Sequence, residues 1–368
     1  MECSSLLYYI GVYIVSSCLA TISSSKEKHK SKMAFLLAVL IPSIMAGSRY
    51  FTGTDYKNYL QIYNEIVRYG FSVTTPNLEI GYLFINKVCI ELGLGYQWVL
   101  FVMSWITNYY ALKAILVYKN DFNSGLAYFV YLVCYYQASY NLVRQAAAMT
   151  ISLYAVTRLE KEKRLEAVIY VIVATLFHNS ALIILLPMLT YILYKSNLPQ
   201  YIKNGYTGVM CLLLLFYDKV FKFVMNFMPF LSRYAGYVER GQYEDFGVTV
   251  FIRYGYIIIP FLLVFKRYKR EKRLIYPFII FIFCFVFRLA TYSATFSLAV
   301  RLVYFFQIYQ IFCIPLLYRY FKEHPHIKND YVHIVSKIIV LITVVFWIYD
   351  YFILGVNATV PYKSVLGI

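Results

Sequence analysis

The chain has 368 residues, of which 61% are hydrophobic and only 14% are charged. With a mean hydropathy of +0.60, this composition excludes a soluble globular protein and is typical of a polytopic helical membrane protein. The formal net charge of +17 does not indicate nucleic-acid binding, because the basic residues lie in short loops between apolar segments. The seven cysteines form no CxxC motif and no cluster with histidine, so we expect neither a metal site nor a disulfide framework.

The first two predicted spans are joined by a basic loop. Residues 6–22 and 33–46 are apolar, and the connection 26–32 is rich in lysine. Because basic loops are retained in the cytoplasm, we expect the N-terminus to lie outside. The first apolar run lacks a basic segment before it, so the pattern is not that of a cleavable signal peptide.

Residues 47–95 are expected to lie at the outer face. Charged side chains interrupt every candidate span in this segment, which opens with the polar, glycine-containing run RYFTGTDY at 49–56. Apolar residues recur at helical spacing over residues 79–86. This spacing predicts an amphipathic helix that lies on the outer leaflet or dips into it.

The next predicted elements are spans over residues 96–118 and 125–139, followed by a membrane-inserted hairpin. The two apolar limbs of the hairpin, 146–156 and 167–177, flank a charged turn at 158–164, which we place in the cytoplasm. The open end of the hairpin therefore faces outward.

Polar side chains stand at that open end. Arg144 and Gln145 precede the first limb, and His178 and Asn179 follow the second. The sequence thus predicts that a cation, an amide and an imidazole share one membrane face. The alternative interpretation is that Arg144 reaches lipid headgroups and that His178 is a hydrogen-bonded interface residue.

In the rest of the chain we expect spans that are short for a bilayer core about 30 Å thick, and some of them are expected to be broken or tilted where they line a cavity. These spans cover residues 180–195, 205–216, 248–264, 274–287, 301–318 and 332–354. The connections are a second outer-face loop (217–247), a short outer connection (288–300) and cytoplasmic loops (266–273 and 320–330). We expect about twelve crossings, with a range of roughly ten to fourteen, in one all-α membrane domain (residues 1–368) whose C-terminus also lies outside.

A set of arginines is left near the outer face, against the positive-inside bias. They are Arg49, Arg68, Arg144, Arg233, Arg240, Arg253, Arg288 and Arg301. A bare guanidinium inside a span costs about 2.5–3.5 kcal/mol, so each needs an anionic partner. The outer carboxylates are too few for all of them, and planar guanidinium groups suit a diphosphate attached to a lipid. The alternative is that they bind anionic lipid or pair with carboxylates.

Two side chains are candidate proton acceptors, and no motif for a metal-bound nucleotide appears at the outer face. A free imidazole titrates near pH 6.5, so His178 could accept a hydroxyl proton at neutral pH. Asp55 could do the same, or could orient a sugar hydroxyl or an arginine.

Several short motifs together resemble the EpsG family of bacterial polysaccharide polymerases, a group that includes many Wzy-type O-antigen and capsule polymerases. The motifs are RYFTGTDY at 49–56, EIGY at 79–82, RQA at 144–146, FHNSA at 177–181, the span that begins at Arg301, and PY at 361–362. Each motif is weak alone, but their order and their common membrane side make the combination moderately specific. The resemblance extends over nearly the whole chain.

The resemblance implies a GT-C-like glycosyltransferase of the bacterial inner membrane that uses no metal or other cofactor. Its substrates would be undecaprenyl-diphosphate-linked oligosaccharides as donor and acceptor, and a chain-length regulator protein is an expected partner. The family pattern is matched at Arg49, Asp55, Arg144, His178 and Arg301, and less closely at Glu79. Arg233, Arg240 and Arg253 are candidates for the diphosphate on charge alone.

Two other functional classes remain open. A flippase for lipid-linked oligosaccharide would distribute basic residues through the depth of the bundle, whereas here they gather at one face. A polymer-to-lipid ligase of the O-antigen type, or a membrane acyltransferase, is a nearer alternative, and a ligase would use the same diphosphate chemistry on a different acceptor.

Overall fold

A computed structural model describes residues 2–71, 78–220, 223, 248–268, 272–293, 297–323 and 331–367. In these ranges the chain is helical and forms no strand, apart from one antiparallel bridge between Arg49 and Ser364. The contacts divide the chain into two compact units. Unit 1 comprises Met1–Ile184 and Tyr318–Ile368, and unit 2 comprises Leu185–Leu317.

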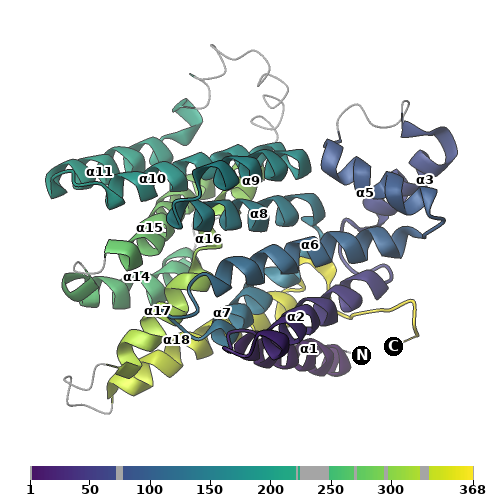
Figure 1. The fold of residues 1–368 in the computed structure, drawn as a ribbon, viewed down its shortest axis with the longest axis horizontal. Coiled ribbons are helices and arrows are strands. Elements are labelled where there is room, and N and C mark those ends of the chain that lie inside the picture. Colours follow the sequence, from purple (N-terminus) through teal and green to yellow (C-terminus); the bar gives the residue numbers. More distant parts are fainter. Residues whose placement is uncertain are drawn as a thin grey trace. The chain divides into compact units, whose positions relative to one another are not determined.

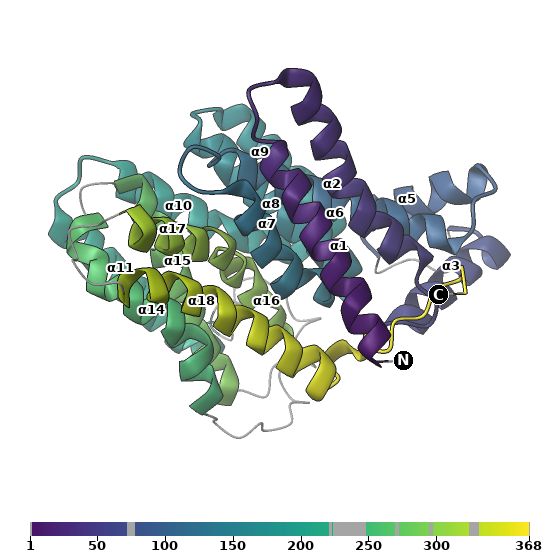
Figure 2. The same cartoon turned by 90° about the horizontal axis from the view of Figure 1, so that it is seen from below.

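Unit 1 holds the N-terminal helices, the hairpin and the C-terminal segment (Figures 1 and 2). Its α-helices are α1 (Glu2–Ile22), α2 (Lys28–Ser48), α3 (Tyr56–Tyr69), α5 (Ile80–Glu91), α6 (Tyr96–Leu116), α7 (Ser124–Tyr131), α8 (Val143–Glu160), α9 (Arg164–Phe177) and α18 (Tyr331–Ile348). Short π and 3-10 turns are η1 (Leu132–Tyr136), η2 (Ala138–Tyr140), η3 (Asn179–Ile184), η5 (Tyr349–Ile353) and η6 (Val356–Ala358). In both views α3, α5 and the C-terminal end of the chain lie at the same end of this unit.

Small residues let the long helices of unit 1 approach closely, as in other membrane bundles. A Cβ added to Gly47 of α2 would lie 2.6 Å from Cβ of Phe101 on α6, and one added to Gly125 of α7 would lie 2.5 Å from the Ser17 carbonyl oxygen on α1. The hairpin helices α8 and α9 pack along their length, and Arg158 Nε donates to Glu166 Oε2 at 2.7 Å near their tip. These contacts hold the two limbs of the hairpin together.

Unit 2 is built around α15 (Lys272–Ser293), which contacts α10 (Leu185–Lys195), α11 (Gln200–Leu215), α14 (Val248–Tyr268) and α16 (Ser297–Gln307). The last helix to begin in it is α17 (Gln310–Glu323). Its core is aromatic: Phe261 and Phe278 stack with their ring centroids 4.1 Å apart.

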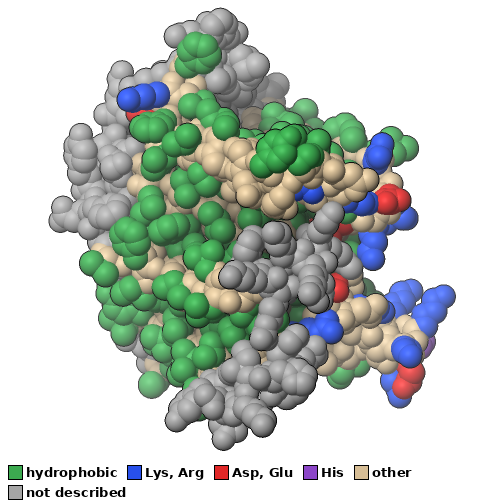
Figure 3. Space-filling model, turned by 90° about the vertical axis from the view of Figure 1, so that its left-hand side faces the viewer, with side chains coloured by type: hydrophobic (Ala, Val, Ile, Leu, Met, Phe, Trp, Pro, Cys, Tyr) green, Lys and Arg blue, Asp and Glu red, His purple; other side chains and the backbone are tan. Residues whose placement is uncertain are grey.

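Five described helices are long and apolar enough to cross a membrane: Cys3–Ile22, Lys28–Ser48, Tyr96–Leu116, Arg301–Lys322 and Ile334–Ile353. Shorter apolar helices are Ser124–Tyr136, Asn179–Lys195, Val250–Val264 and Ile275–Thr291. In the view of Figure 3 hydrophobic side chains make up most of the described surface. These findings confirm an all-helical membrane protein, while the count of about twelve crossings and the GT-C-like arrangement stay predictions.

The structure differs from the sequence-based expectations at several elements. Helix α3 was not expected, although Tyr56, Tyr59 and Ile66 form its buried face at helical spacing. The outer connection expected at 288–300 is helical as far as Ser293. Thr291 does not interrupt that helix because its hydroxyl donates to the carbonyl of Arg288 at 3.2 Å.

The span expected at 301–318 is confirmed as the apolar stretch Arg301–Lys322, which comprises the end of α16 and most of α17, and α17 continues to Glu323 into the loop expected from 320. The helix expected at 125–139 is α-helical only as far as Tyr131 and continues as the turns η1 and η2. Nearly all of the outer-face loop expected at 217–247 lies outside the described residues.

Candidate active site

A single carboxylate joins a guanidinium and an imidazole at the open end of the hairpin. Glu79 immediately precedes α5, Arg144 lies in the first turn of α8, and His178 follows the last turn of α9. Glu79 Oε2 accepts a hydrogen bond from the Arg144 guanidinium, and its Oε1 lies 2.5 Å from Nδ1 of His178. The Glu79 side chain is 8% exposed, against 24% for Arg144 and 19% for His178. We call Glu79, Arg144 and His178 the Glu79 clamp.

The electrostatics of the clamp keep Glu79 ionised. Burial by itself would raise the pKa of this carboxyl, but the hydrogen bond with His178 and the charge of Arg144 outweigh burial and lower the pKa below its ordinary value of 4.5. Because Nδ1 of His178 faces a carboxylate, a neutral imidazole carries its proton on Nδ1 and its lone pair on Nε2. Nε2 makes no hydrogen bond within the described part of the chain.

A close contact between α5 and α9 brings Glu79 within hydrogen-bond distance of His178. A Cβ added to Gly81, in the first turn of α5, would lie 2.8 Å from the carbonyl oxygen of Leu176 near the end of α9. Glu79 and His178 are each two residues from this contact. Gly81 therefore lets α5 approach α9 closely enough for Glu79 to reach the imidazole, which gives a physical reason for the glycine in the EIGY motif.

Two tyrosines extend the cluster, and sequence reasoning did not single them out. Tyr59 of α3 packs against Tyr82 of α5 with ring centroids 5.7 Å apart, and Arg144 Cζ lies 5.9 Å from the Tyr82 ring. Burial raises the pKa of Tyr59, Arg144 opposes this rise through its charge and a hydrogen bond, and the charge of Asp55 adds to it. Tyr59 therefore lies within electrostatic reach of both Arg144 and Asp55. The apolar spacing of α3 is the signal that could have identified Tyr59.

Asp55 lies where the 49–55 loop enters α3. Its backbone N–H donates to Asn141 Oδ1 at 3.2 Å, and its half-buried carboxylate forms no ion pair with any residue that the structure describes. Asn141 stands three residues before Arg144, so one short segment contacts both Asp55 and the clamp. Within unit 1, Tyr59 and Asn141 thus connect Asp55 to the clamp.

Comparison with known proteins gives the same family as the motifs. A family model described as the EpsG family matches residues 32–364, a range that includes all of the residues of this cluster. The chain belongs to the EpsG family. No curated protein and no solved structure matches it. Family membership indicates a polysaccharide polymerase-like role for this EpsG-family protein.

Arg49 of the EpsG-family chain is buried against Tyr140. It is 2% exposed, donates from a guanidinium nitrogen to the Tyr140 carbonyl at 3.0 Å, and lies 4.3 Å from the centre of the Tyr140 ring. Its Nε has no partner among the described residues. The adjoining cavity, lined also by Ser104, Thr107 and Ser139, has a volume of about 10 Å³. That space holds about one water molecule and is too small for a phosphate group.

The other expected binding residues belong to other parts of the chain or fall outside the described residues. Gln145 is buried in the packed side of α8. Arg253 lies on α14 and Arg301 on α16, both in unit 2, whereas the clamp lies in unit 1. Arg233 and Arg240 fall outside the described residues. No group of three or more His, Cys, Asp or Glu side chains in the described ranges is arranged to hold a metal ion.

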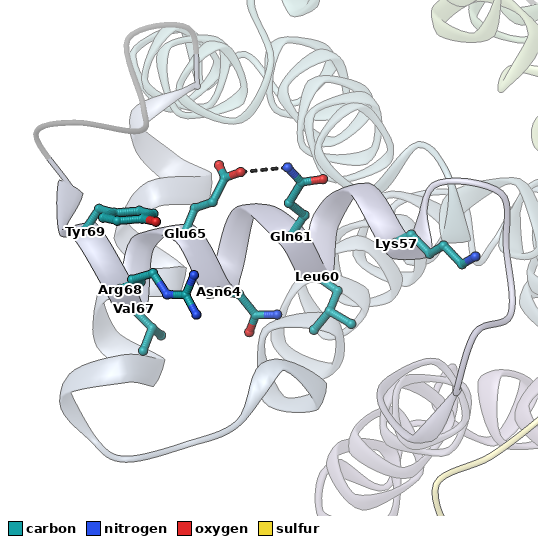
Figure 4. A pocket seen from close by; sticks show the side chains of 8 residues that line it. All are labelled: Lys57, Leu60, Gln61, Asn64, Glu65, Val67, Arg68 and Tyr69. Atoms are coloured by element: carbon teal, nitrogen blue, oxygen red, sulfur yellow. Dashed lines mark hydrogen bonds between the residues drawn. The ribbon is translucent and has the colours of Figure 1, made fainter.

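A polar groove follows the exposed face of α3 (Figure 4), with a volume of about 650 Å³. The described residues that line it are Lys57, Leu60, Gln61, Asn64, Glu65, Val67, Arg68 and Tyr69. Gln61 Nε2 donates to Glu65 Oε1 at 2.7 Å. The volume lies within the range of small-molecule sites, and amide, carboxylate and guanidinium groups can bond to hydroxyl groups.

Proposed function

We propose that this EpsG-family protein is a polysaccharide polymerase. It joins undecaprenyl-diphosphate-linked oligosaccharide repeat units at the outer face of the bacterial inner membrane, to build O-antigen, capsule or another exopolysaccharide. The family supports the general role. The observation that carries the proposal is the Glu79 clamp, in which one buried carboxylate contacts an imidazole and a guanidinium at the open end of the hairpin.

In the proposed reaction His178 is the general base. Its Nε2 accepts the proton of an acceptor sugar hydroxyl as that oxygen bonds to the anomeric carbon of the donor. The bond from the anomeric carbon to the diphosphate oxygen breaks, and the lipid diphosphate leaves with the electron pair. Glu79 holds Nδ1–H of His178 and stabilises the imidazolium that forms, as the carboxylate does in a Ser-His-Asp triad.

Arg144 is proposed to stabilise the leaving diphosphate. A guanidinium has five N–H donors, and Glu79 and Tyr59 engage only some of them, so its quarter-exposed face can bind a phosphate oxygen. Charge builds on the diphosphate as the glycosidic bond breaks, so a fixed cation there stabilises the transition state more than the ground state. Asp55 is proposed to orient the acceptor hydroxyl. Arg49, which is buried, is given a structural role.

The groove on α3 is proposed to bind sugar residues of the repeat unit. The groove lies on the exposed face of α3, and Tyr59 lies on the buried face of the same helix. A saccharide in the groove would therefore be bound by the helix that contributes Tyr59 to the site. Arg68 and Asn64 would bond to sugar hydroxyls, and Tyr69, which is 55% exposed, would provide a ring surface.

The test is polymerisation in vitro with purified lipid-linked repeat units. We expect His178→Ala and Arg144→Ala to lower the rate by about 10²-fold or more at normal expression. The matched controls are His29→Ala and Arg164→Ala, because both side chains are exposed. His29 lies in the first turn of α2, and Arg164 begins α9 at the end of the hairpin opposite the clamp. Full-length polymer from both clamp variants would refute the assignment.

Gene deletion distinguishes the other functions. Gel analysis of surface polysaccharide should show a single capped repeat if a polymerase is lost. Complete absence of repeats would instead indicate a flippase, and unattached polymer would indicate a ligase.

A further inference from the structure

The 49–55 loop, which delivers Asp55, is held in a backbone conformation that it would not adopt alone. Phe51 has a φ of 46° and Gly53 a φ of 102°, both at positive values that residues other than glycine rarely adopt. A Cβ added to Gly53 would lie 2.7 Å from Asn141 Oδ1. Such a loop keeps its shape only where neighbouring segments determine it.

The first of those neighbours is the C-terminal tail (residues 355–365). Backbone N–H groups of Tyr50, Gly53 and Thr54 donate to carbonyls of the tail at 2.8, 2.9 and 3.1 Å. The accepting residues are Lys363, Ala358 and Asn357 in that order, so the loop and the tail run antiparallel. Residues about 300 positions apart in the sequence thus complete each other's backbone hydrogen bonds.

The tail is itself anchored to the long helices. The Tyr9 hydroxyl of α1 donates to the Thr359 carbonyl at 2.9 Å, and the Tyr362 N–H donates to Ser5 Oγ at 2.9 Å. The buried hydroxyl of Tyr362 donates to the Met45 carbonyl of α2 at 2.7 Å. Through the tail, the loop is fixed to helices that cross the membrane.

The second neighbour is Asn141, whose side chain connects three segments. Its Oδ1 accepts from the Asp55 N–H at 3.2 Å, and its Nδ2 donates to the Asn357 carbonyl of the tail at 3.1 Å. Its own carbonyl accepts from the Tyr59 hydroxyl at 3.4 Å. Asn141 uses both ends of its amide, so no residue without a donor and an acceptor can replace it.

We propose that the C-terminal tail is a structural part of the active site and that Asn141 is a positioning residue. Asn141 bonds to the 49–55 loop and lies just before α8, so it holds Asp55 in place relative to the clamp. The functional half of this inference rests on the proposed polymerase reaction. The positional half does not, because it concerns which backbone amides are protected.

The positional half is tested by hydrogen exchange at single amides of the purified full-length protein and its variants. Removal of residues 355–368 should speed exchange at Tyr50, Gly53 and Thr54 by at least tenfold, because their acceptors are lost. Asn141→Ala should do so at Asp55. Removal of residues 366–368 alone is the control, because the tail bonds to the loop remain. Unchanged exchange in both variants would overturn the proposal.

The functional half is tested by steady-state polymerisation, normalised to the folded fraction in size-exclusion chromatography. We expect Asn141→Ala to lower kcat at least tenfold while KM for the lipid-linked unit changes less than threefold. Asn141→Asp keeps the acceptor for Asp55 and loses the donor to the tail, so its kcat should lie between those of the wild type and Asn141→Ala. Wild-type kcat in Asn141→Ala, with exchange at Asp55 accelerated, would show that the loop position does not matter for the reaction.

A second variant tests the same contact in case Asn141→Ala does not fold. Gly53→Ala places a methyl group against Asn141 Oδ1 from the loop side and should reproduce the fall in kcat. The two substitutions act on one contact, so together they should lower kcat by less than the product of their separate effects. A fully multiplicative effect would overturn the coupling. If the wild type makes no polymer, the proposed function fails, and the exchange experiment still decides the positional half.

Discussion

Replacing Glu79 by glutamine removes one charge from the clamp and changes the shape of the side chain little. In the wild type the buried carboxylate accepts from Arg144 and lies 2.5 Å from His178 Nδ1. A glutamine amide places an oxygen in one of these two positions and an NH2 group in the other, so one of the two partners faces a donor in place of an acceptor. We therefore expect Glu79→Gln to weaken both the stability of unit 1 and the chemistry assigned to His178.

The effect on stability follows from burial. Breaking a fully buried charge pair costs about 3–5 kcal/mol, because the remaining charge is left without a partner. Here Arg144 and His178 keep 24% and 19% of their side-chain exposure, so water relieves part of the penalty. We expect a loss of about 2–3 kcal/mol, or a fall in Tm of roughly 4–12 °C.

The matched control lies at the other end of α5. Glu91→Gln makes the same chemical change to a side chain that is 64% exposed and lies 3.8 Å from Lys87. An exposed pair of this kind contributes about 0–1 kcal/mol, so its Tm should stay close to that of the wild type.

The effect on activity is tested with a double-mutant cycle. A general base contributes about 10²–10⁴-fold to a rate, and Glu79→Gln should remove a large part of this by releasing the imidazole. If Glu79 acts through His178, the rates of His178→Ala and of the double variant should agree within about threefold. Thermal unfolding and polymerisation rates in the same detergent supply both measurements. A Tm equal to that of Glu91→Gln, or independent rate losses in the cycle, would refute the reasoning.

Three further predictions concern the same unit. The pKa of Glu79 in the folded protein is lower than its ordinary 4.5, so its stabilisation is fully present above that pH and is lost as pH falls through the lower value. The Tm difference between the wild type and Glu79→Gln should therefore shrink below pH 4.5, and a constant difference would contradict this. Gly81→Ala should lower the free energy of unfolding by about 1–3 kcal/mol, because the added Cβ would lie 2.8 Å from the Leu176 carbonyl oxygen. Gly11→Ala is the control, because the added methyl group meets open space and should not lower stability. Equal losses in the two variants would count against the close contact. The cavity beside Arg49 should show one ordered water in a high-resolution density map, and density for a larger group would be inconsistent with a volume of about 10 Å³.

Much of the candidate site could be derived from the sequence because it depends on local pattern. The hairpin periodicity placed Arg144 and His178 at one end of two neighbouring helices, and the polar runs at 49–56 and 79–82 drew attention to Asp55 and Glu79. What periodicity cannot supply is the pairing. The sequence left open which carboxylate meets which cation, and only the packing of α5 on α9 answers this with Glu79.

Other parts of the site were beyond the reach of pattern. Arg49 stands in the same motif as Asp55, yet the first is enclosed against Tyr140 and the second is half-buried and unpaired within the described residues. Asn141 carries no sequence signal, because an asparagine between two helices is common and its partners are distant in the chain. The chain has 41 tyrosines, and only the helical spacing of Tyr56, Tyr59 and Ile66 marks Tyr59 as part of a buried face.

Apolar length, the distribution of basic loops and short motifs are local properties of the chain, so they were enough to predict a helical membrane protein of the EpsG family. Which polar groups meet depends instead on how the helices pack. A buried carboxylate selects partners within hydrogen-bond distance, and that distance depends on a glycine contact between α5 and α9. The antiparallel pairing of the 49–55 loop with the C-terminal tail is likewise a product of folding, since its two halves come from opposite ends of the chain.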